Sequence, residues 1–258
     1  MKCLNFCVVA FCCLISLNAF AQTPQQIESD LLKLFKKIDY WREKQYDTTV
    51  DVNKRINSLE IANDGFAKKL KFYAEKFPSV IAYPFNALKE DYLDIMTSSD
   101  NMFRIYSWDT ETGGTMHFFE SVMQYKSGSG YKAIIDTPKS EGEAGPLYTQ
   151  MYTLKTNGKT YYLTIWLFIG STIDMAEGLH VYTIEKGKLI DANLIKTHSG
   201  VHSELSYEAH GNSYDRPKIH FDGAANIIYL PLVTEGHNFT SKFILYKFTG
   251  QYFERVKN

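Results

Sequence analysis

Cysteine is confined to the first thirteen positions of this 258-residue chain, where all 4 of its cysteines lie. That stretch begins Met1-Lys2-Cys3-Leu4, continues as an apolar run to Leu17 and ends at Ala19-Phe20-Ala21. One basic residue, a short apolar core and a small residue on either side of Phe20 predict a secretory signal peptide over residues 1–21. We therefore expect a secreted or periplasmic protein whose mature chain, cut after Ala21, contains no cysteine.

A mature chain without cysteine excludes a disulfide framework, a thiol nucleophile, a thiolate zinc site and an iron–sulfur cluster. A lipid anchor is not expected either, because it needs a cysteine after a small residue. Cys12 follows Phe11, and Cys13 follows Cys12. The most apolar later window, residues 161–169, is about half the ~20 residues that a membrane-spanning helix needs. We predict no membrane span.

A strong charge of either sign is also missing. Lysine and arginine together number 28 and aspartate and glutamate 29, for a net charge of −1. The longest cationic cluster is Lys68-Lys69-x-Lys71. Because phosphate backbones are bound by clustered cations, nucleic acid is not expected as a partner.

Common catalytic and cofactor motifs do not occur in the chain. We find no G-x-S-x-G elbow, no H-E-x-x-H, no phosphate loop and no dinucleotide fingerprint. A Ser–His–acid triad assembled from distant strands is defined by geometry and leaves no such trace. The sequence predicts no cofactor and favours a protein that is not an enzyme.

The N-terminal part of the mature chain has helical periodicity. Apolar residues recur at i, i+4, i+7 and i+11, at Ile27, Leu31, Leu34 and Ile38. Thr23-Pro24 is a typical cap and first-turn pair. A second periodic stretch covers residues 52–77, where Asn63-Asp64-Gly65 weakens the pattern and can break it into two helices. Residues 87–96 predict a further short helix.

The pattern turns to β near residue 98. Short segments rich in aromatic and branched residues follow one another, separated by glycine-containing turns. Asn157-Gly158 is the strongest hairpin signal among them. We therefore predict an α+β chain with a helical segment over 22–97 and an antiparallel β domain over 98–258. Its β-meander is expected to form a sandwich-like or an incomplete propeller-like sheet.

Histidines and carboxylates are densest between residues 198 and 210. On a strand, one face would carry His202, Glu204, Ser206, Glu208 and His210. His202 and His210 would lie roughly 26 Å apart at ~3.3 Å per residue, too far for one ion. His198, His202 and Glu204 remain the candidate metal ligands, since imidazole and carboxylate suit zinc. A solvated polar face on a half-covered strand explains the same alternation and is the favoured interpretation.

A second candidate site lies between Asp109 and Glu120. Asp at the first position, Gly at the sixth and Glu at the twelfth match a calcium loop. The third and fifth positions, Glu111 and Gly113, do not fit that role, and both flanks predict strands. A hairpin turn around Gly113-Gly114 explains the residues better.

The same hairpin end brings aromatic rings close to acids in the sequence, as sugar-binding sites do. The candidate ligand-binding residues are Tyr106, Trp108 and His117. The candidate catalytic carboxylates are Asp109, Glu111 and Glu120, since two acids at a suitable separation can cleave a glycosidic bond. The alternative for Trp108 is simple packing, because it ends a strand and aromatic side chains at such positions commonly enter the core.

The chain as a whole resembles secreted and periplasmic proteins of Bacteroidota. The resemblance rests on the signal end Asn18–Gln22, on a body rich in Tyr, Phe, Lys and Asn, and on the closing segment Leu245–Phe253. It implies the compartment, carries no assigned activity and transfers no functional residue.

The leading functional hypothesis is a non-enzymatic binding protein of the envelope or the exterior, with a glycan, peptide or envelope protein as its ligand. The alternative is a secreted hydrolase that acts on polysaccharide or peptidoglycan through a carboxylate pair.

Overall fold

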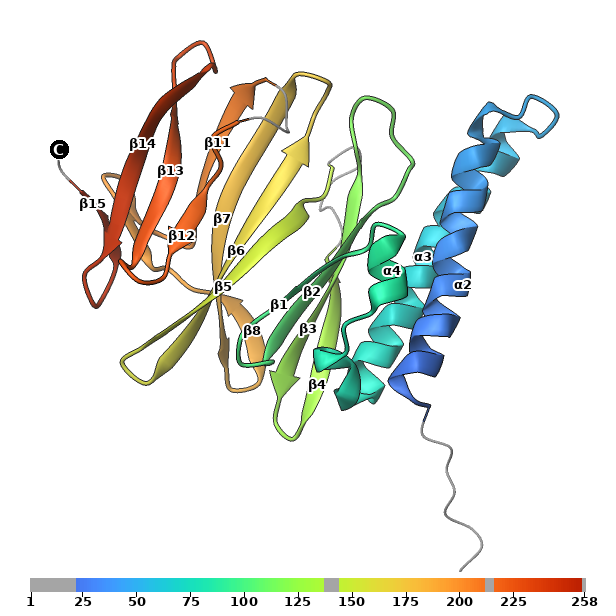
Figure 1. Cartoon of the computed structure of the whole chain (residues 1–258), viewed down its shortest axis with the longest axis horizontal. Coiled ribbons are helices and arrows are strands. Elements are labelled where there is room, and N and C mark those ends of the chain that lie inside the picture. Colours follow the sequence, from blue (N-terminus) through green and yellow to red (C-terminus); the bar gives the residue numbers. More distant parts are fainter. Residues whose placement is uncertain (1–21, 137–143, 212–215, 257–258) are drawn as a thin grey trace, which may run out of the picture.

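The computed structural model describes residues 22–136, 144–211 and 216–256 (Figure 1). It confirms the predicted α+β class, because helices at the N-terminal side are followed by mostly antiparallel strands. The predicted signal peptide and all the cysteines fall outside the described residues. Within the described ranges, none of the helices combines the length and the apolar character that crossing a membrane requires.

Two long helices form a hairpin that covers one end of the molecule. Helix α2 (Pro24–Glu43) begins at Thr23, whose hydroxyl accepts from the Gln26 N–H at 3.3 Å while the Gln26 side chain accepts from the Thr23 N–H at 2.8 Å. This capping box confirms the cap predicted from Thr23-Pro24. The short 3₁₀ turn η1 (Lys44–Tyr46) leads to α3 (Val52–Lys76). A second 3₁₀ turn, η2 (Pro78–Ala82), and helix α4 (Asn86–Glu90) follow.

Helix α3 continues without a break through Asn63-Asp64-Gly65, where the sequence pattern predicted a weak point. The reason is tertiary. The buried Asn63 amide donates to the carbonyl of Leu59 at 3.0 Å and to that of Thr110 at 2.9 Å, and it accepts from the Trp108 indole at 2.9 Å. These three bonds fix Asn63 within the helix, because a buried amide needs its partners. Local propensity is overridden by contacts with the neighbouring sheet.

The first sheet packs directly on the helices. It has the order β1 (Asp94–Thr97), β2 (Phe103–Asp109), β3 (Phe119–Ser127) and β4 (Gly130–Asp136). Strand β1 lies in a segment predicted as helix, and the β structure therefore begins before residue 98. Ile95 lies opposite Tyr106 in the ladder, and both belong to the apolar core shared with α2 and α3. Pairing with β2 decides the conformation of this segment.

The second sheet has the order β11-β7-β6-β5, with β8 paired beside β7. Its strands are β5 (Leu147–Thr156), β6 (Lys159–Ile169), β7 (Asp174–Glu185), β8 (Lys188–Asp191) and β11 (Glu204–His210). The predicted Asn157-Gly158 hairpin joins β5 to β6 with φ of 51° and 72°. Two consecutive positive φ angles are those of a type I′ turn, which favours this residue pair.

The third sheet has the order β10-β9-β15-β14-β13-β12. Its strands are β9 (Ile195–Thr197), β10 (Gly200–His202), β12 (His220–Asp222), β13 (Ile227–Val233), β14 (Phe239–Phe248) and β15 (Phe253–Arg255). The β15–β9 pair is parallel, and the other pairs are antiparallel. One face of this sheet packs on the second sheet.

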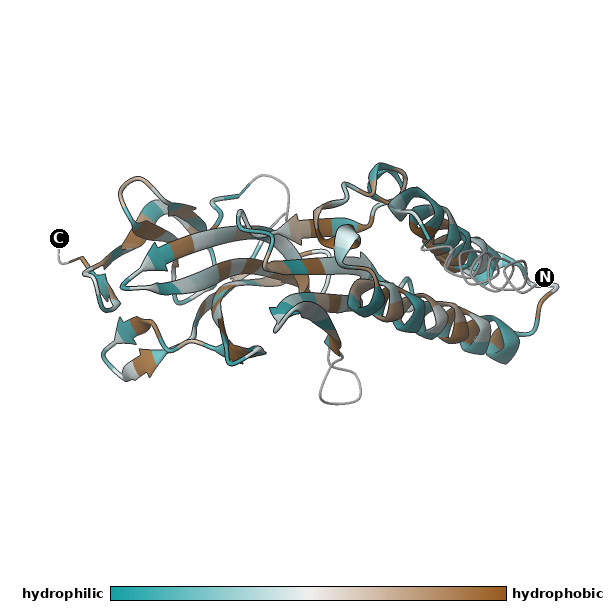
Figure 2. Cartoon of the chain, turned by 90° about the horizontal axis from the view of Figure 1, so that it is seen from below, coloured by the Kyte–Doolittle hydropathy of each residue, from teal (hydrophilic) through white to brown (hydrophobic). Residues whose placement is uncertain are grey.

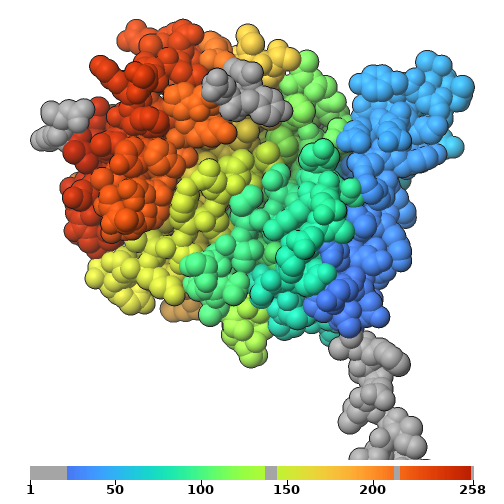
Figure 3. Space-filling view, in the orientation of Figure 1, coloured from blue at the N-terminus to red at the C-terminus, as the bar shows by residue number. Residues whose placement is uncertain are grey.

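The layers therefore follow one another as helices, first sheet, second sheet and third sheet, from right to left in Figure 1, and Figure 2 shows from below that the helices lie at one end of the stack of strands. A separate apolar core lies at each of the three junctions. Three sheets stack in a row, which is one layer more than a two-sheet sandwich has. Figure 3 shows the tip of the α2–α3 hairpin projecting beyond the sheets at the upper right.

Candidate functional site

The third sheet carries a shallow groove with a volume of about 870 Å³, to which residues of both faces of β14 contribute. Side chains of a strand alternate between the two faces, so Phe243 and Leu245 on β14 point away from the core that Tyr246 joins. Phe243 and Leu245 are half-buried, and Val256 beyond β15 is 37% exposed. The lining consists of Lys196, Thr197, His198, Leu232, Lys242, Phe243, Ile244, Leu245, Tyr246, Arg255 and Val256.

This face departs from what a half-covered antiparallel sheet normally presents. The uncovered face of such a sheet is usually polar. Here Phe243 contacts the rings of His220 and Tyr229, with centroids 5.7 and 6.0 Å apart, and His220 stacks on Tyr229 at 4.4 Å. An aromatic cluster beside Leu245 thus stays open to solvent on the last layer of the stack.

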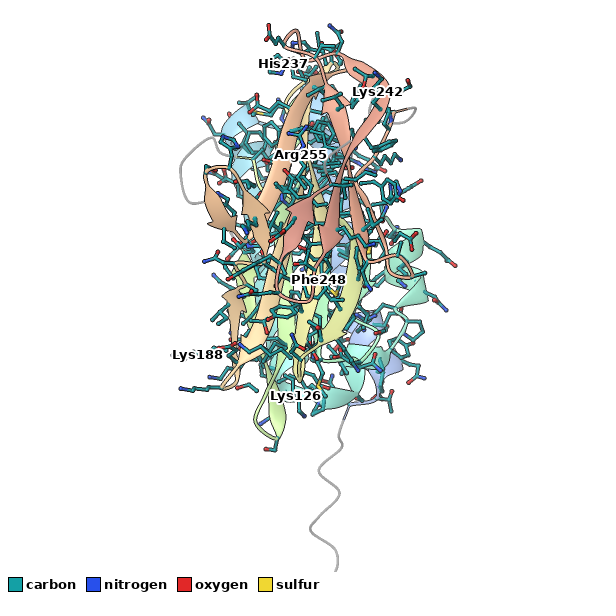
Figure 4. All side chains as sticks on the ribbon, turned by 90° about the vertical axis from the view of Figure 1, so that its left-hand side faces the viewer. Lys126, Lys188, His237, Lys242, Phe248 and Arg255 are labelled. Atoms are coloured by element: carbon teal, nitrogen blue, oxygen red, sulfur yellow. The ribbon has the colours of Figure 1, made fainter. Side chains whose placement is uncertain are left out.

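The charges that line the groove are all of one sign. Lys196, Lys242 and Arg255 contribute cations, and no carboxylate belongs to the lining. Lys196 pairs with Glu254 at 3.0 Å. Within the described parts of the chain, Lys242 and Arg255 form no ion pair. Figure 4 looks onto this face and shows Lys242 on β14 above Arg255 on β15. Lys242 has the strand parity of Tyr246, and Arg255 lies opposite Tyr246 in the ladder, so these two cations, unpaired within the described ranges, border the groove from the side opposite to Phe243 and Leu245.

Two of the predicted ligand-binding residues lie in the core. Tyr106 and Trp108 are both 0% exposed. The Trp108 ring packs edge-on against Phe66 with centroids 4.9 Å apart, and the Tyr106 hydroxyl donates to Gln124 at 3.1 Å. The packing alternative for Trp108 is confirmed. Neither ring belongs to the surface, because β2 turns this face toward the helices.

Asp109, Glu111 and His117 are brought together at the end of β2, as the sequence suggested. The Asp109 carboxylate accepts from the Glu111 N–H at 2.8 Å and contacts the His117 imidazole. Glu111 in turn accepts from Arg42 at 3.2 Å. Burial raises the pKa of Glu111, helped by the charge of Asp109 and opposed by Arg42. This cluster fastens the loop after β2 to the helix hairpin.

Glu120 stands apart from that cluster. It lies on β3 opposite Trp108, and its Oε2 atom is buried with no hydrogen-bond partner in the described part of the chain. Burial, and secondarily the charge of Asp64, raises the pKa of this carboxyl. None of the three candidate carboxylates lines the groove on the third sheet.

The three candidate metal ligands are not placed as one site. His198 lines the groove, His202 contacts the Ser199 hydroxyl at 3.0 Å, and Glu204 faces His180 with 3.8 Å between Nδ1 and Oε2. Across the ranges that the structure describes, no three His, Cys, Asp or Glu side chains are arranged to hold a metal ion. On β11 the residues Glu204, Ser206, Glu208 and His210 are all exposed. The solvated face favoured from the alternation is confirmed.

Comparison with models of known protein families, with curated proteins and with solved structures finds no match.

The groove itself was missed by the sequence reasoning. Lys242 and Arg255 lie on successive strands, but Lys196 comes from a segment more distant in the chain, and each looks like an ordinary surface cation. One signal was available. Phe243 and Leu245 stand at alternate positions of a strand whose other face is apolar as well, which indicates a strand covered on both sides.

Proposed function

We propose that this chain is a non-enzymatic exported binding protein that holds an acidic polypeptide segment in the groove on the third sheet. The observation that carries the proposal is the lining of that groove, where apolar side chains are accompanied by the cations Lys242 and Arg255, unpaired among the described residues, while Lys196 is paired with Glu254. Export rests on the predicted signal peptide over residues 1–21.

The apolar part of the lining favours a polypeptide over other anionic ligands. Phe243, Leu245 and Val256 offer no side-chain hydrogen bonds, so they suit apolar side chains better than sugar hydroxyls. Lys242 and Arg255 then match carboxylates of the same segment, because complementary charges steer and orient a ligand. Nucleic acid fits less well, since the whole chain has a net charge of −1.

The groove also lacks a pair of groups for acid–base chemistry. His198 is its one imidazole, and no carboxylate of the lining accompanies it. If the chain were a hydrolase, its catalytic carboxylates would have to lie outside the groove. Asp109 and Glu111, its nearest carboxylate pair, are tied to His117 and Arg42.

A direct test uses the purified chain from residue 22 and two fluorescent peptides of equal length. One alternates Glu with Phe and Val, and the other replaces every Glu by Lys. Fluorescence anisotropy should detect binding of the acidic peptide alone, weakened by salt. The double variant Lys242→Glu/Arg255→Glu should weaken it at least about tenfold, which corresponds to ~1.4 kcal/mol.

The matched control is Lys188→Glu. Lys188 is an exposed cation on β8, at the lower end of the molecule in Figure 4 and outside the groove. Its reversal changes net charge in the same direction and should leave binding nearly unchanged. Equal weakening by both changes, or no binding of the acidic peptide, would overturn the proposal. Cleavage of polysaccharide or peptidoglycan that is lost in Glu111→Gln would favour the hydrolase instead.

A further inference from the structure

A tyrosine takes a backbone position that normally belongs to glycine at the end of helix α4. The Tyr92 N–H donates to the carbonyl of Lys89 at 3.1 Å, and the Leu93 N–H donates to that of Leu88 at 3.0 Å. This pair of bonds is the Schellman motif, whose C′ residue is left-handed and usually glycine. Tyr92 has φ of 69°. A side chain with a Cβ is strained there.

Among the described residues, the Tyr92 side chain makes no contact that would stabilise the fold and offset this strain. Tyr92 is 86% exposed, and in the described part of the chain its ring and hydroxyl form no hydrogen bond, ring stacking or cation–π contact. A strained residue that packs on nothing needs another explanation, and strained backbone is concentrated at functional positions. A contact with a ligand is such an explanation.

Tyr92 borders a hollow of about 360 Å³ between α4 and the C-terminal half of α2. Tyr40, on α2, lines the same hollow and is 52% exposed. The remaining lining residues are Lys36, Asp39, Arg42, Glu43 and Asp91. Two exposed aromatic side chains therefore flank a polar floor.

Most charges of that floor are paired with one another. The Lys36 ammonium lies 2.6 Å from Asp91 and 3.4 Å from Asp39. Arg42 lies 3.4 Å from Asp39 and 3.2 Å from Glu111. Such a network presents donors and acceptors at fixed positions with little net charge, so it favours a neutral polar ligand over an ion.

We propose that this hollow is a binding site for a neutral carbohydrate. The aromatic faces of Tyr40 and Tyr92 would pack on the C–H faces of a sugar ring, and its hydroxyls would exchange hydrogen bonds with the Lys36–Asp91 and Arg42–Asp39 pairs. The site lies at the helical end of the stack, away from the third sheet, and does not depend on the function proposed for the groove (Figure 1).

The test is a titration of the full exported chain with neutral oligosaccharides, followed by calorimetry and by ligand-observed NMR. The panel comprises cello-, malto-, xylo- and chito-oligosaccharides. At least one should bind with a millimolar or tighter dissociation constant. Tyr92→Gly should raise the melting temperature by a few degrees, because glycine relieves the strain. The same variant should weaken sugar binding at least about tenfold.

Two further variants distinguish the effect of the aromatic ring on sugar binding from the effect of the backbone strain. Tyr92→Phe keeps the aromatic face and should retain most of the affinity. Tyr46→Ala removes another exposed tyrosine, 88% exposed in η1 and outside the hollow, and should leave binding unchanged. If Tyr92→Gly fails to fold, Tyr92→Asn removes the ring with a residue that tolerates the left-handed region. The proposal is overturned if no sugar of the panel binds, or if Tyr92→Gly or its substitute binds like the wild type.

Discussion

Glu177 and Arg216 form an ion pair beside the core between the second and third sheets, with side chains only 4% and 2% exposed. Arg216 donates to Glu177 at 2.9 Å. The other carboxylate oxygen accepts from the Tyr207 hydroxyl and from the Ile219 N–H, both at 2.8 Å. The pair thus links β7 and β11 of one sheet to the segment that enters the next.

Glu177→Gln is the informative change. It keeps the volume and leaves an oxygen to accept from Tyr207 and Ile219, so the main loss is the negative charge opposite a buried guanidinium. Removing one partner of a buried ion pair costs about 3–5 kcal/mol. Since a domain is stable by only about 5–15 kcal/mol, the variant should be strongly destabilised. Near the melting temperature, this corresponds to a decrease of roughly 6–20 °C for a chain of this size.

The assay is urea unfolding followed by tryptophan fluorescence on the wild type, Glu177→Gln, Arg216→Met and the double variant. The double variant should be more stable than the sum of the two single losses allows, because no buried charge is then left alone. Single losses below about 1 kcal/mol, or strictly additive ones, would refute the reasoning, since the pair would then behave as a hydrated surface pair.

Two further predictions concern single positions. Gly178 lies opposite Trp166, and an added Cβ would approach the indole ring to 2.3 Å. Gly178→Ala should therefore cost about 1–3 kcal/mol in chemical unfolding, whereas Gly65→Ala, in helix α3 with open space around it, should stabilise by about 0.5–1 kcal/mol. Glu120→Gln tests how the stability of the fold depends on pH. Burial raises the folded-state pKa of Glu120 above its ordinary 4.5, so the wild type loses stability as pH rises from that value through the folded pKa. The melting temperature of the variant should exceed that of the wild type at pH well above this window and should equal it at pH below 4.5. A higher melting temperature of the variant that persists below pH 4.5 would contradict the raised pKa of Glu120.

The candidate site shows where prediction from sequence stops. Aromatic and acidic residues from Tyr106 to His117 are close in sequence, and for that reason they were predicted to form a binding or catalytic site. The structure separates them by face, with Trp108 turned into the core and Asp109 and His117 in contact at the loop. Alternation along a strand predicts that two faces exist, and only the neighbouring layer decides which face is covered.

Local signals determined the class and much of the chain's order of elements. The Thr23 capping box, the helical periodicity of the N-terminal part and the Asn157-Gly158 hairpin act within a few residues, so they can be recognised without knowing the rest of the chain. Tertiary contacts decided what those signals left open. Asn63 stays helical because Trp108 and Thr110 satisfy its amide, and β1 is a strand because β2 lies beside it. The groove belongs to this second group, since Lys196 on β9 reaches the β14–β15 hairpin only through the parallel pairing of β9 with β15.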